Sequence, residues 1–290
     1  MWKRWRMLVP VWKERSYRMG IPYKDFFPPI LIKLIKKILR KNRVKYFNSF
    51  RDAEDACVLS KDGWQYKEMC QMVGDKTTIY RDAINKPYNI QATYLLLEGA
   101  LTKFYSEYQK KINILDFGGS CGTVYFDIRP LLGEKIKLEW KVIDLPEMIQ
   151  SAKKHNLANN ELQFFESIEN ASGNIDIIHT SSTLHYAENA YEIIQKFIDL
   201  NPVYILFNRM LFNETENDLF IIHHSAYRGI GPGKIPVGYT DKNIDFPVMI
   251  MSFNKFSRIL EGQYDLEWKF NVGKDVNGIT EKGLLYIKRS

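Results

Sequence analysis

The sequence has few cysteines and no long apolar stretch. Its three cysteines, Cys57, Cys70 and Cys121, are odd in number and lack the spacing of a metal-binding motif, which favours free thiols in a reducing compartment over a disulfide framework. No apolar segment is long enough to span a bilayer. The short segment MLVPVW runs directly into charged residues, unlike a secretory signal. These absences predict a cytoplasmic protein.

Composition then sets the scale of the fold. The 290 residues are 45% hydrophobic and 26% charged, so the chain can bury the core of one large domain with an added subdomain, or of two small ones. Residues 1–50 hold 14 Lys and Arg against two acids, whereas the rest of the chain holds 27 against 32. A basic leader therefore precedes a mildly acidic body, and the pI near 9.0 describes neither part alone.

Residues 1–47 read as a basic amphipathic segment. Apolar residues recur at helical spacing after the Pro28-Pro29 pair, with lysines on the other side of the expected helix. Through residues 28–45 such a helix could lie on an anionic membrane surface, or it could pack on its own domain with a solvated charged face. Nucleic acid is not expected as a partner, because the body shows no matching basic and aromatic pattern.

Residues 48–110 read as a helical extension or lid that begins with an N-cap at Asn48 or Ser49. The rhythm then changes over residues 111–290. The segments INILDF, LEWKVID, LQFFE, IDIIHT and VYILFN read as strands, separated by helix-compatible stretches at 121–133, 146–158 and 186–200. This alternation predicts an α/β fold with a doubly wound parallel sheet.

A long irregular section is expected to follow the fifth strand, as an insertion at about 209–251. A helix at 252–261 and two strands, YDLEWKF and GLLYIKR, then close the chain. Long loops inside α/β domains are usually functional or disordered. This one follows the carboxyl end of a strand, which is where open α/β sheets bind ligands.

The first predicted strand runs into a glycine-rich turn, ILDFGGSCG, from Ile114 to Gly122. A dinucleotide-binding loop would need G-x-G-x-x-G, but its first glycine would fall on Phe117. Asp116 at the strand end would also repel a pyrophosphate in a partly dry cleft. An acid in this place suits a cationic ligand, such as the ammonium and sulfonium groups of S-adenosylmethionine.

A second acid follows at the end of the next predicted strand. Asp144 lies 25 residues after Gly119, where an acid in such folds accepts hydrogen bonds from the ribose hydroxyls of a nucleotide. Alternatively, Asp144 could only cap the helix that begins near Pro146. The glycine turn, the second acid and the β/α alternation together favour a site for S-adenosylmethionine.

The sequence also resembles a family of S-adenosylmethionine-dependent methyltransferases from bacterial polysaccharide and lipopolysaccharide gene clusters. The resemblance runs from about Phe26 onward. It rests on PPILIKLIKK, FNSFRDAEDAC, YRD at 80–82, LDFGGSCG, VIDLPEM, STLHYAENA and LFNRM. It implies a class I methyltransferase core with S-adenosylmethionine as cofactor and S-adenosylhomocysteine as product, an α-helical N-terminal extension, and a lid inserted after the fifth strand.

The resemblance also implies which residues hold the cofactor. The glycine turn would line its methionine end, Asp144 would bind the ribose, Leu145 would flank the adenine, and Phe165 and Glu166 would lie near the adenine edge. The full expected set of cofactor-binding residues is Asp116, Gly118, Gly119, Ser120, Gly122, Asp144, Leu145, Phe165, Glu166 and Ser181.

Methyl transfer from a sulfonium is mainly a positioning task, but a hydroxyl acceptor must also lose its proton to a nearby base. His185, just past the fourth predicted strand, resembles in spacing the catalytic histidine of small-molecule O-methyltransferases. His223 and His224 in the insertion are its rivals; as neighbours on an extended segment they point to opposite faces, so at most one would enter the cleft. His179, inside the fourth strand, could be structural or contact the cofactor.

Tyr186 and Arg209 are the candidate substrate-binding residues. Arg209 could bind an acidic acceptor or form an ion pair that holds the insertion closed. No metal site is predicted, and the absence of a DPPY-like or NPPY-like motif argues against methylation of nucleobase amino groups. Cys121 in the glycine turn could have a lowered pKa or could simply fill space.

The predicted function is therefore O-methylation of a sugar in a bacterial surface polysaccharide or its lipid-linked precursor. Two alternatives stay open: a non-catalytic glycan-assembly protein that keeps the methyltransferase fold, and a methyltransferase for small molecules or peptides. A lipid-linked acceptor would suit a protein on the inner face of the membrane. The sequence does not indicate an oligomeric state.

Overall fold

The structure is a computed structural model that describes residues 44–59, 63–84, 92–171, 173–272 and 278–289. By its contacts the chain divides into residues 1–45 and 46–290, and the sheet and its helices belong to the second unit. The helix predicted after Pro29 lies outside the described residues. None of the helices in the described residues combines the length and the apolar character that crossing a membrane requires.

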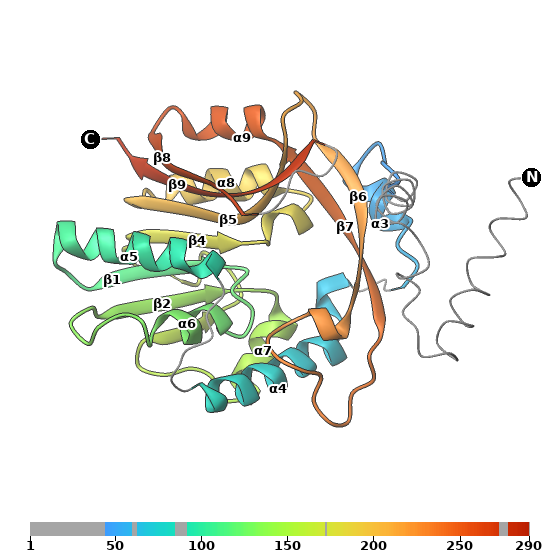
Figure 1. The fold of residues 1–290 in the computed structure, drawn as a ribbon, viewed down its shortest axis with the longest axis horizontal. Helices are drawn as coiled ribbons and strands as arrows, with labels where there is room; N and C mark the ends of the chain where they lie inside the picture. Colours follow the sequence, from blue (N-terminus) through green and yellow to red (C-terminus); the bar gives the residue numbers. More distant parts are fainter. Residues whose placement is uncertain (1–43, 60–62, 85–91, 172, 273–277, 290) are drawn as a thin grey trace, which may run out of the picture. The chain divides into compact units, whose positions relative to one another are not determined.

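A mixed sheet forms the centre of the described unit (Figure 1). Strands β3, β2, β1, β4 and β5 are hydrogen-bonded in that order and are all parallel, which confirms the predicted doubly wound sheet. Strand β9 pairs antiparallel with β5, and β8 pairs antiparallel with β9. The bounds are β1 Ile112–Phe117, β2 Leu138–Ile143, β3 Leu162–Phe165, β4 Ile177–Ser181, β5 Tyr204–Asn213, β8 Tyr264–Asn271 and β9 Ile279–Lys288.

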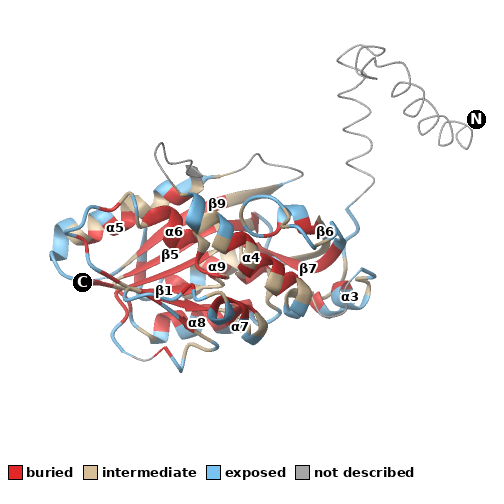
Figure 2. Ribbon diagram, turned by 90° about the horizontal axis from the view of Figure 1, so that it is seen from below, coloured by how far each residue is buried: buried red, intermediate tan, exposed pale blue. Residues whose placement is uncertain are grey.

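Helices cover both faces of this sheet. Because side chains alternate along each strand, one face carries Ile114 and Trp140 and packs on α5, α6 and α7, while the other carries Ile205 and Phe207 and packs on α8 and α9. Buried residues accordingly concentrate on the strands between the helices (Figure 2). The helices are α5 Leu95–Tyr108, α6 Thr123–Ile128, α7 Pro146–Lys154, α8 Ala190–Asp199 and α9 Phe253–Leu260.

The extension before the sheet is mostly helical where it is described. Helix α3 (Phe50–Asp55) begins after Ser49, whose hydroxyl accepts a hydrogen bond from the Asp52 amide at 3.0 Å, which confirms the predicted N-cap. A short 3-10 turn, η2 (Gly63–Gln65), precedes helix α4 (Lys67–Ala83), and another, η3 (Ala92–Tyr94), precedes α5. Helix α4 buries its apolar side against α7.

The prediction of an irregular section at 209–251 is wrong. Strand β5 continues to Asn213, and β6 (Leu219–Ala226) and β7 (Asn243–Ser252) form an antiparallel hairpin. Strand β7 also joins β5, where Phe212 pairs with Met251. These strands depend on partners distant in sequence, which a local sequence pattern does not reveal. Within this section only the connections at 214–218 and 227–242 lack a strand.

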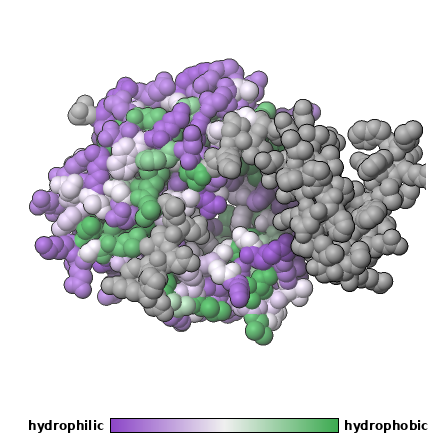
Figure 3. Space-filling model, in the orientation of Figure 1, coloured by the Kyte–Doolittle hydropathy of each residue, from purple (hydrophilic) through white to green (hydrophobic). Residues whose placement is uncertain are grey.

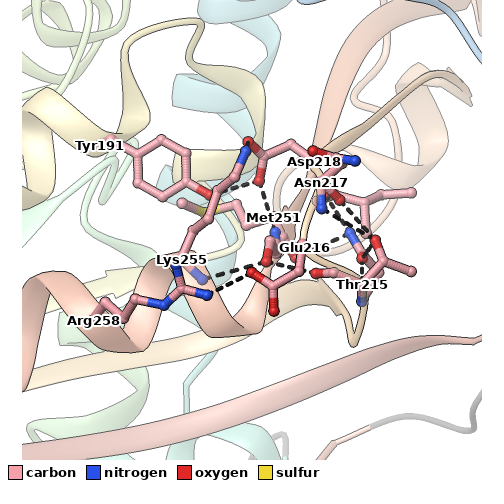
Figure 4. Close-up of polar contacts among 11 residues, drawn as sticks. Tyr191, Thr215, Glu216, Asn217, Asp218, Met251, Lys255 and Arg258 are labelled. Atoms are coloured by element: carbon pink, nitrogen blue, oxygen red, sulfur yellow. Dashed lines mark hydrogen bonds and ion pairs between the residues drawn. The ribbon is translucent and has the colours of Figure 1, made fainter.

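Polar contacts join the base of this hairpin to helices α8 and α9 (Figure 4). The Asp218 carboxylate accepts hydrogen bonds from the Tyr191 hydroxyl at 2.6 Å and the Ser252 amide at 2.7 Å, and it pairs with Lys255 at 3.1 Å. Glu216 pairs with Arg258 on the same helix as Lys255. These contacts fix where the hairpin leaves the sheet and so set its position over the strand ends.

The described surface visible in Figure 3 is mostly hydrophilic, with hydrophobic side chains in small separate groups. Single exposed apolar residues are normal on protein surfaces. The polar groups buried at the carboxyl ends of the strands are more informative.

Candidate functional site

The glycine turn follows β1 and packs tightly against its surroundings. Gly118 has φ +73, and a Cβ there would lie 2.2 Å from the Thr183 side chain. A Cβ on Gly119 would lie 2.5 Å from Oδ2 of Asp116. Only glycine fits these two positions without a shift, so the turn lies directly over the Asp116 carboxylate and beside the segment that follows β4.

Asp116 is 1% exposed, and both of its carboxylate oxygens have partners on the neighbouring strands. Oδ2 accepts a hydrogen bond from Nε1 of Trp140 on β2 at 3.1 Å, and Oδ1 lies 2.8 Å from Nδ1 of His179 on β4. The three side chains lie on one sheet face. Asp116 pairs in register with His179 on one side and with Val142 on the other, and Trp140 lies two residues before Val142. Sequence reasoning missed Trp140, although the two-residue period of the strands could have identified it.

Asp144 follows β2 and is bonded to the glycine turn. Its Oδ2 accepts from the Ser120 amide at 2.7 Å, and its Oδ1 accepts from the Leu145 amide at 2.8 Å. Asp144 is not the N-cap of α7: Leu145 holds that position, without a side-chain capping bond. Burial of the carboxylate raises the pKa of Asp144 to about 6, against the two backbone hydrogen bonds, which lower it.

The residues expected near the adenine lie around the same strand end. Phe165 ends β3 and pairs in register with Ile143, the last residue of β2. Glu166 is exposed, with its carboxylate 3.9 Å from the Lys153 ammonium. The cofactor role of these residues and of Leu145 stays a prediction.

Three residues other than glycine have a left-handed backbone conformation at this edge of the sheet. Ser120 after β1 has φ +54, Ser182 after β4 has φ +56, and Arg209 within β5 has φ +53, in an irregularity of its pairing with β9. Such residues cost free energy and cluster at functional sites. Their positions, after β1, after β4 and within β5, make this edge of the sheet the candidate ligand site.

His185 lies beyond Ser182, in the short turn η4 (Leu184–Tyr186), and is 2% exposed. Burial lowers the pKa of His185 to about 3, and the charges of His223 and Arg209 act in the same direction. Its Nε2 lies 3.5 Å from the Ser182 hydroxyl, and among the described residues its Nδ1 has no hydrogen-bond partner. The imidazole is therefore neutral near neutral pH and is a weak proton acceptor.

Tyr186 connects this turn to the inserted hairpin. Its hydroxyl lies 2.9 Å from Nδ1 of His223, and its ring packs edge-on against Trp64 and Phe246, at centroid distances of 5.1 and 5.6 Å. His224, by contrast, lies 2.6 Å from the Asp245 carboxylate. The two histidines thus contact different partners, as expected for neighbours on a strand, and only His223 contacts Tyr186.

Arg209 forms the ion pair considered from the sequence, but its partner Glu281 is on β9 and not in the insertion, with Nε to Oε1 at 3.3 Å. Tyr94, which sequence reasoning also missed, is 7% exposed beside this pair. Burial raises its pKa to about 12, and Asp127, Arg209 and Asp116 are all close enough to act on it electrostatically.

The described residues contain no group of His, Cys, Asp and Glu side chains that could hold a metal ion. Cys121 is fully buried in the glycine turn, and burial raises its pKa. Of the two alternatives for Cys121, the space-filling one fits this environment.

No protein-family model matches the chain, and no curated protein matches it. Several solved structures are similar in fold. The N-terminal domain of EvdMO1 with SAH bound is 12% identical and covers 66% of this chain and 81% of its own, with a TM-score of 0.42. An S-adenosylmethionine-dependent methyltransferase from Clostridium acetobutylicum ATCC 824 is 13% identical and covers 73% and 97%, with a TM-score of 0.43.

Magnesium protoporphyrin IX methyltransferase (ChlM) from Synechocystis PCC 6803 with bound SAM is 12% identical, covers 74% of this chain and 98% of its own, and has a TM-score of 0.41. At this level of similarity, ligands must be assigned from this chain's own residues. The fold itself follows from the topology. Strands in the order 3-2-1-4-5-9-8, with only β9 antiparallel to the rest, form the class I methyltransferase sheet.

Proposed function

We propose that this protein transfers a methyl group from S-adenosylmethionine to a hydroxyl group of a sugar, in a bacterial surface polysaccharide or its lipid-linked precursor. The observation that carries the cofactor assignment is the pair of hydrogen bonds that join the Asp144 carboxylate to the Ser120 and Leu145 amides. They place an acid beside the glycine turn at the strand ends, where the hydroxyls of a ribose can reach its remaining lone pairs.

The charges near the turn favour a cationic cofactor over a dinucleotide. Asp116 lies directly under Gly119, and Asp127 on α6 is 6% exposed and accepts a hydrogen bond from the Tyr80 hydroxyl. A pyrophosphate here would meet two acids, whereas an ammonium and a sulfonium are attracted to them. The cofactor, when bound, supplies the methyl group; this chain's residues hold it and orient the acceptor.

The acceptor side is formed by η4, β5 and the inserted hairpin. We assign the proton acceptor to His223, which contacts Tyr186 and is exposed enough to release a proton to water. His185 is better suited to orient the acceptor as a neutral hydrogen-bonding group, because burial lowers its pKa to about 3. The choice of a glycan acceptor is supported by the family resemblance of the sequence.

Calorimetric titration with S-adenosylmethionine and S-adenosylhomocysteine tests the cofactor. Wild type should bind in the micromolar range, and Asp144→Ala should bind at least about a hundredfold more weakly, because it loses a charged hydrogen-bonding partner. Glu147→Ala is the matched control, since this acid in the first turn of α7 makes no hydrogen bond to the glycine turn. No binding by folded wild type at millimolar ligand would reject the proposal and favour the assembly-protein alternative.

A lipid-linked acceptor would give the basic segment at residues 28–45 a role at an anionic membrane surface. Co-sedimentation of the full chain with vesicles of anionic lipid at low salt should then show binding that decreases as salt is added. No binding at low salt would overturn this part of the proposal and leave the methyltransferase assignment unaffected.

A further inference from the structure

We propose that His179 is a binding residue for the ammonium group of the cofactor's methionine moiety, which its Nε2 contacts from within the sheet. This inference rests on the proposed function and adds a residue to the site. It starts from a buried polar atom: His179 is 0% exposed, and its Nε2 has no hydrogen-bond partner among the described residues. Unpaired buried polar atoms are rare in native proteins and call for an explanation.

The other ring nitrogen fixes how the imidazole is held. Nδ1 of His179 lies 2.8 Å from Oδ1 of Asp116, and a carboxylate can only accept there, so Nδ1 carries the proton. One proton on the ring is enough for this bond, which leaves the Nε2 lone pair available as an acceptor. Asp116 is itself held by Trp140 at 3.1 Å, so the imidazole cannot rotate without breaking a buried chain of hydrogen bonds.

The position of His179 fits the amino-acid end of the cofactor. The ribose acid Asp144 follows β2, the glycine turn follows β1, and His179 is on β4, which is the next strand across the sheet. Neighbouring strands are about 4.8 Å apart, so a ligand anchored at β2 that crosses the turn arrives over β4. His179 pairs in register with Asp116, the residue that lies directly beneath Gly119.

The chemistry of the pair selects the ammonium over the carboxylate of the methionine group. With its ring proton on Nδ1, His179 presents an acceptor, Nε2, beside the Asp116 carboxylate. An ammonium donates to such an atom and is attracted by the charge, whereas a carboxylate would be repelled. A bound ammonium also satisfies the otherwise unpaired Nε2.

The decisive variant is His179→Asn. The amide nitrogen of asparagine can take the place of Nδ1 and keep the hydrogen bond to Asp116, but no atom replaces Nε2. We expect affinity for S-adenosylhomocysteine to fall about tenfold to a hundredfold. Affinity for 5′-methylthioadenosine, which lacks the amino-acid group, should be unchanged. Thr180→Val is the matched control: its hydroxyl is equally buried and unpaired, but alternation places it on the opposite face of β4.

The outcomes separate the two proposals. If wild type binds neither ligand, the proposed function itself fails. If His179→Asn weakens both ligands equally, or neither, His179 has only a structural role and this inference is overturned. A second measurement needs no variant: wild type should bind S-adenosylhomocysteine without its amino group about tenfold or more weakly than S-adenosylhomocysteine itself. Equal affinity for the two would also overturn the inference.

Discussion

The two halves of the ligand-binding edge are assembled differently. The half at the ends of β1 and β2 comes from one continuous stretch, residues 112–145, in which a turn and two acids contact each other directly. The half at the ends of β4 and β5 combines Tyr186 with Trp64 and Phe246, residues far apart in the chain. The first half can therefore be predicted from a sequence motif, whereas the residues of the second half come together only on folding.

The halves also differ in how burial acts on their titratable groups. Burial raises the pKa of Asp144 to about 6 and lowers that of His185 to about 3. In both cases the neutral form is favoured. Asp144 nevertheless changes charge within the pH range in which proteins work, whereas His185 does not. We therefore expect a change of pH to affect cofactor binding through Asp144 far more than it affects the acceptor side through His185.

The largest expected effect comes from filling the space over Asp116. Gly119→Ala would place a methyl group 2.5 Å from Oδ2, which should destabilise the fold by about 1–3 kcal/mol. It should also weaken S-adenosylhomocysteine binding about a hundredfold. Calorimetry and thermal unfolding measure the two effects. Gly133→Ala, which meets nothing within 4 Å, is the control. Normal binding by Gly119→Ala would show that the turn can move away from Asp116.

Acid should weaken cofactor binding through Asp144. Its pKa is raised to about 6 in the ligand-free protein, so below that pH its carboxyl gains a proton and loses an acceptor for the ribose. Affinity for S-adenosylhomocysteine should be constant from pH 7 to 8 and about tenfold lower at pH 5. Calorimetry at each pH measures this, and Asp144→Asn should bind weakly with no such step. A flat wild-type profile would mean that the ribose does not use this carboxylate.

The same shift has the opposite sign for stability. A carboxyl whose pKa is raised by folding opposes folding once it is ionised, so the contribution of Asp144 to stability falls as pH rises from about 4 to about 6. Above pH 6 the ionised Asp144 therefore destabilises the ligand-free protein, in the same pH range in which the cofactor binds most tightly. Bound cofactor should raise the melting temperature more at pH 7 than at pH 5.

The hairpin base offers a way to perturb one half alone. Asp218→Ala removes hydrogen bonds from Tyr191 and Ser252 and the pair with Lys255. It should cost about 1–3 kcal/mol of unfolding free energy in urea. Affinity for S-adenosylhomocysteine should change less than about threefold, because distant sites act independently. A large loss of affinity would show that the halves are coupled.

Local patterns were enough for the sheet and the cofactor half. The five parallel strands, the Ser49 cap and the contact of Asp144 with the glycine turn all follow from residues close in sequence. The hairpin at 219–252 was missed because its strands are stabilised by each other and by β5, across loops that local periodicity does not bridge. Trp64 lies on a 3-10 turn, where no period marks which side chains are buried.

The smallest expected effect tests the contact between Tyr186 and His223. Tyr186→Phe removes a hydrogen bond to a histidine that is partly open to water, so it should cost less than about 1 kcal/mol of stability. Burial lowers the pKa of His223, and Nδ1 of the neutral ring can accept a hydrogen bond from the Tyr186 hydroxyl. That hydrogen bond stabilises the neutral ring. Without it His223 is protonated more easily, so its NMR titration midpoint should rise slightly in the variant. An unchanged midpoint would mean that the two side chains do not interact in solution.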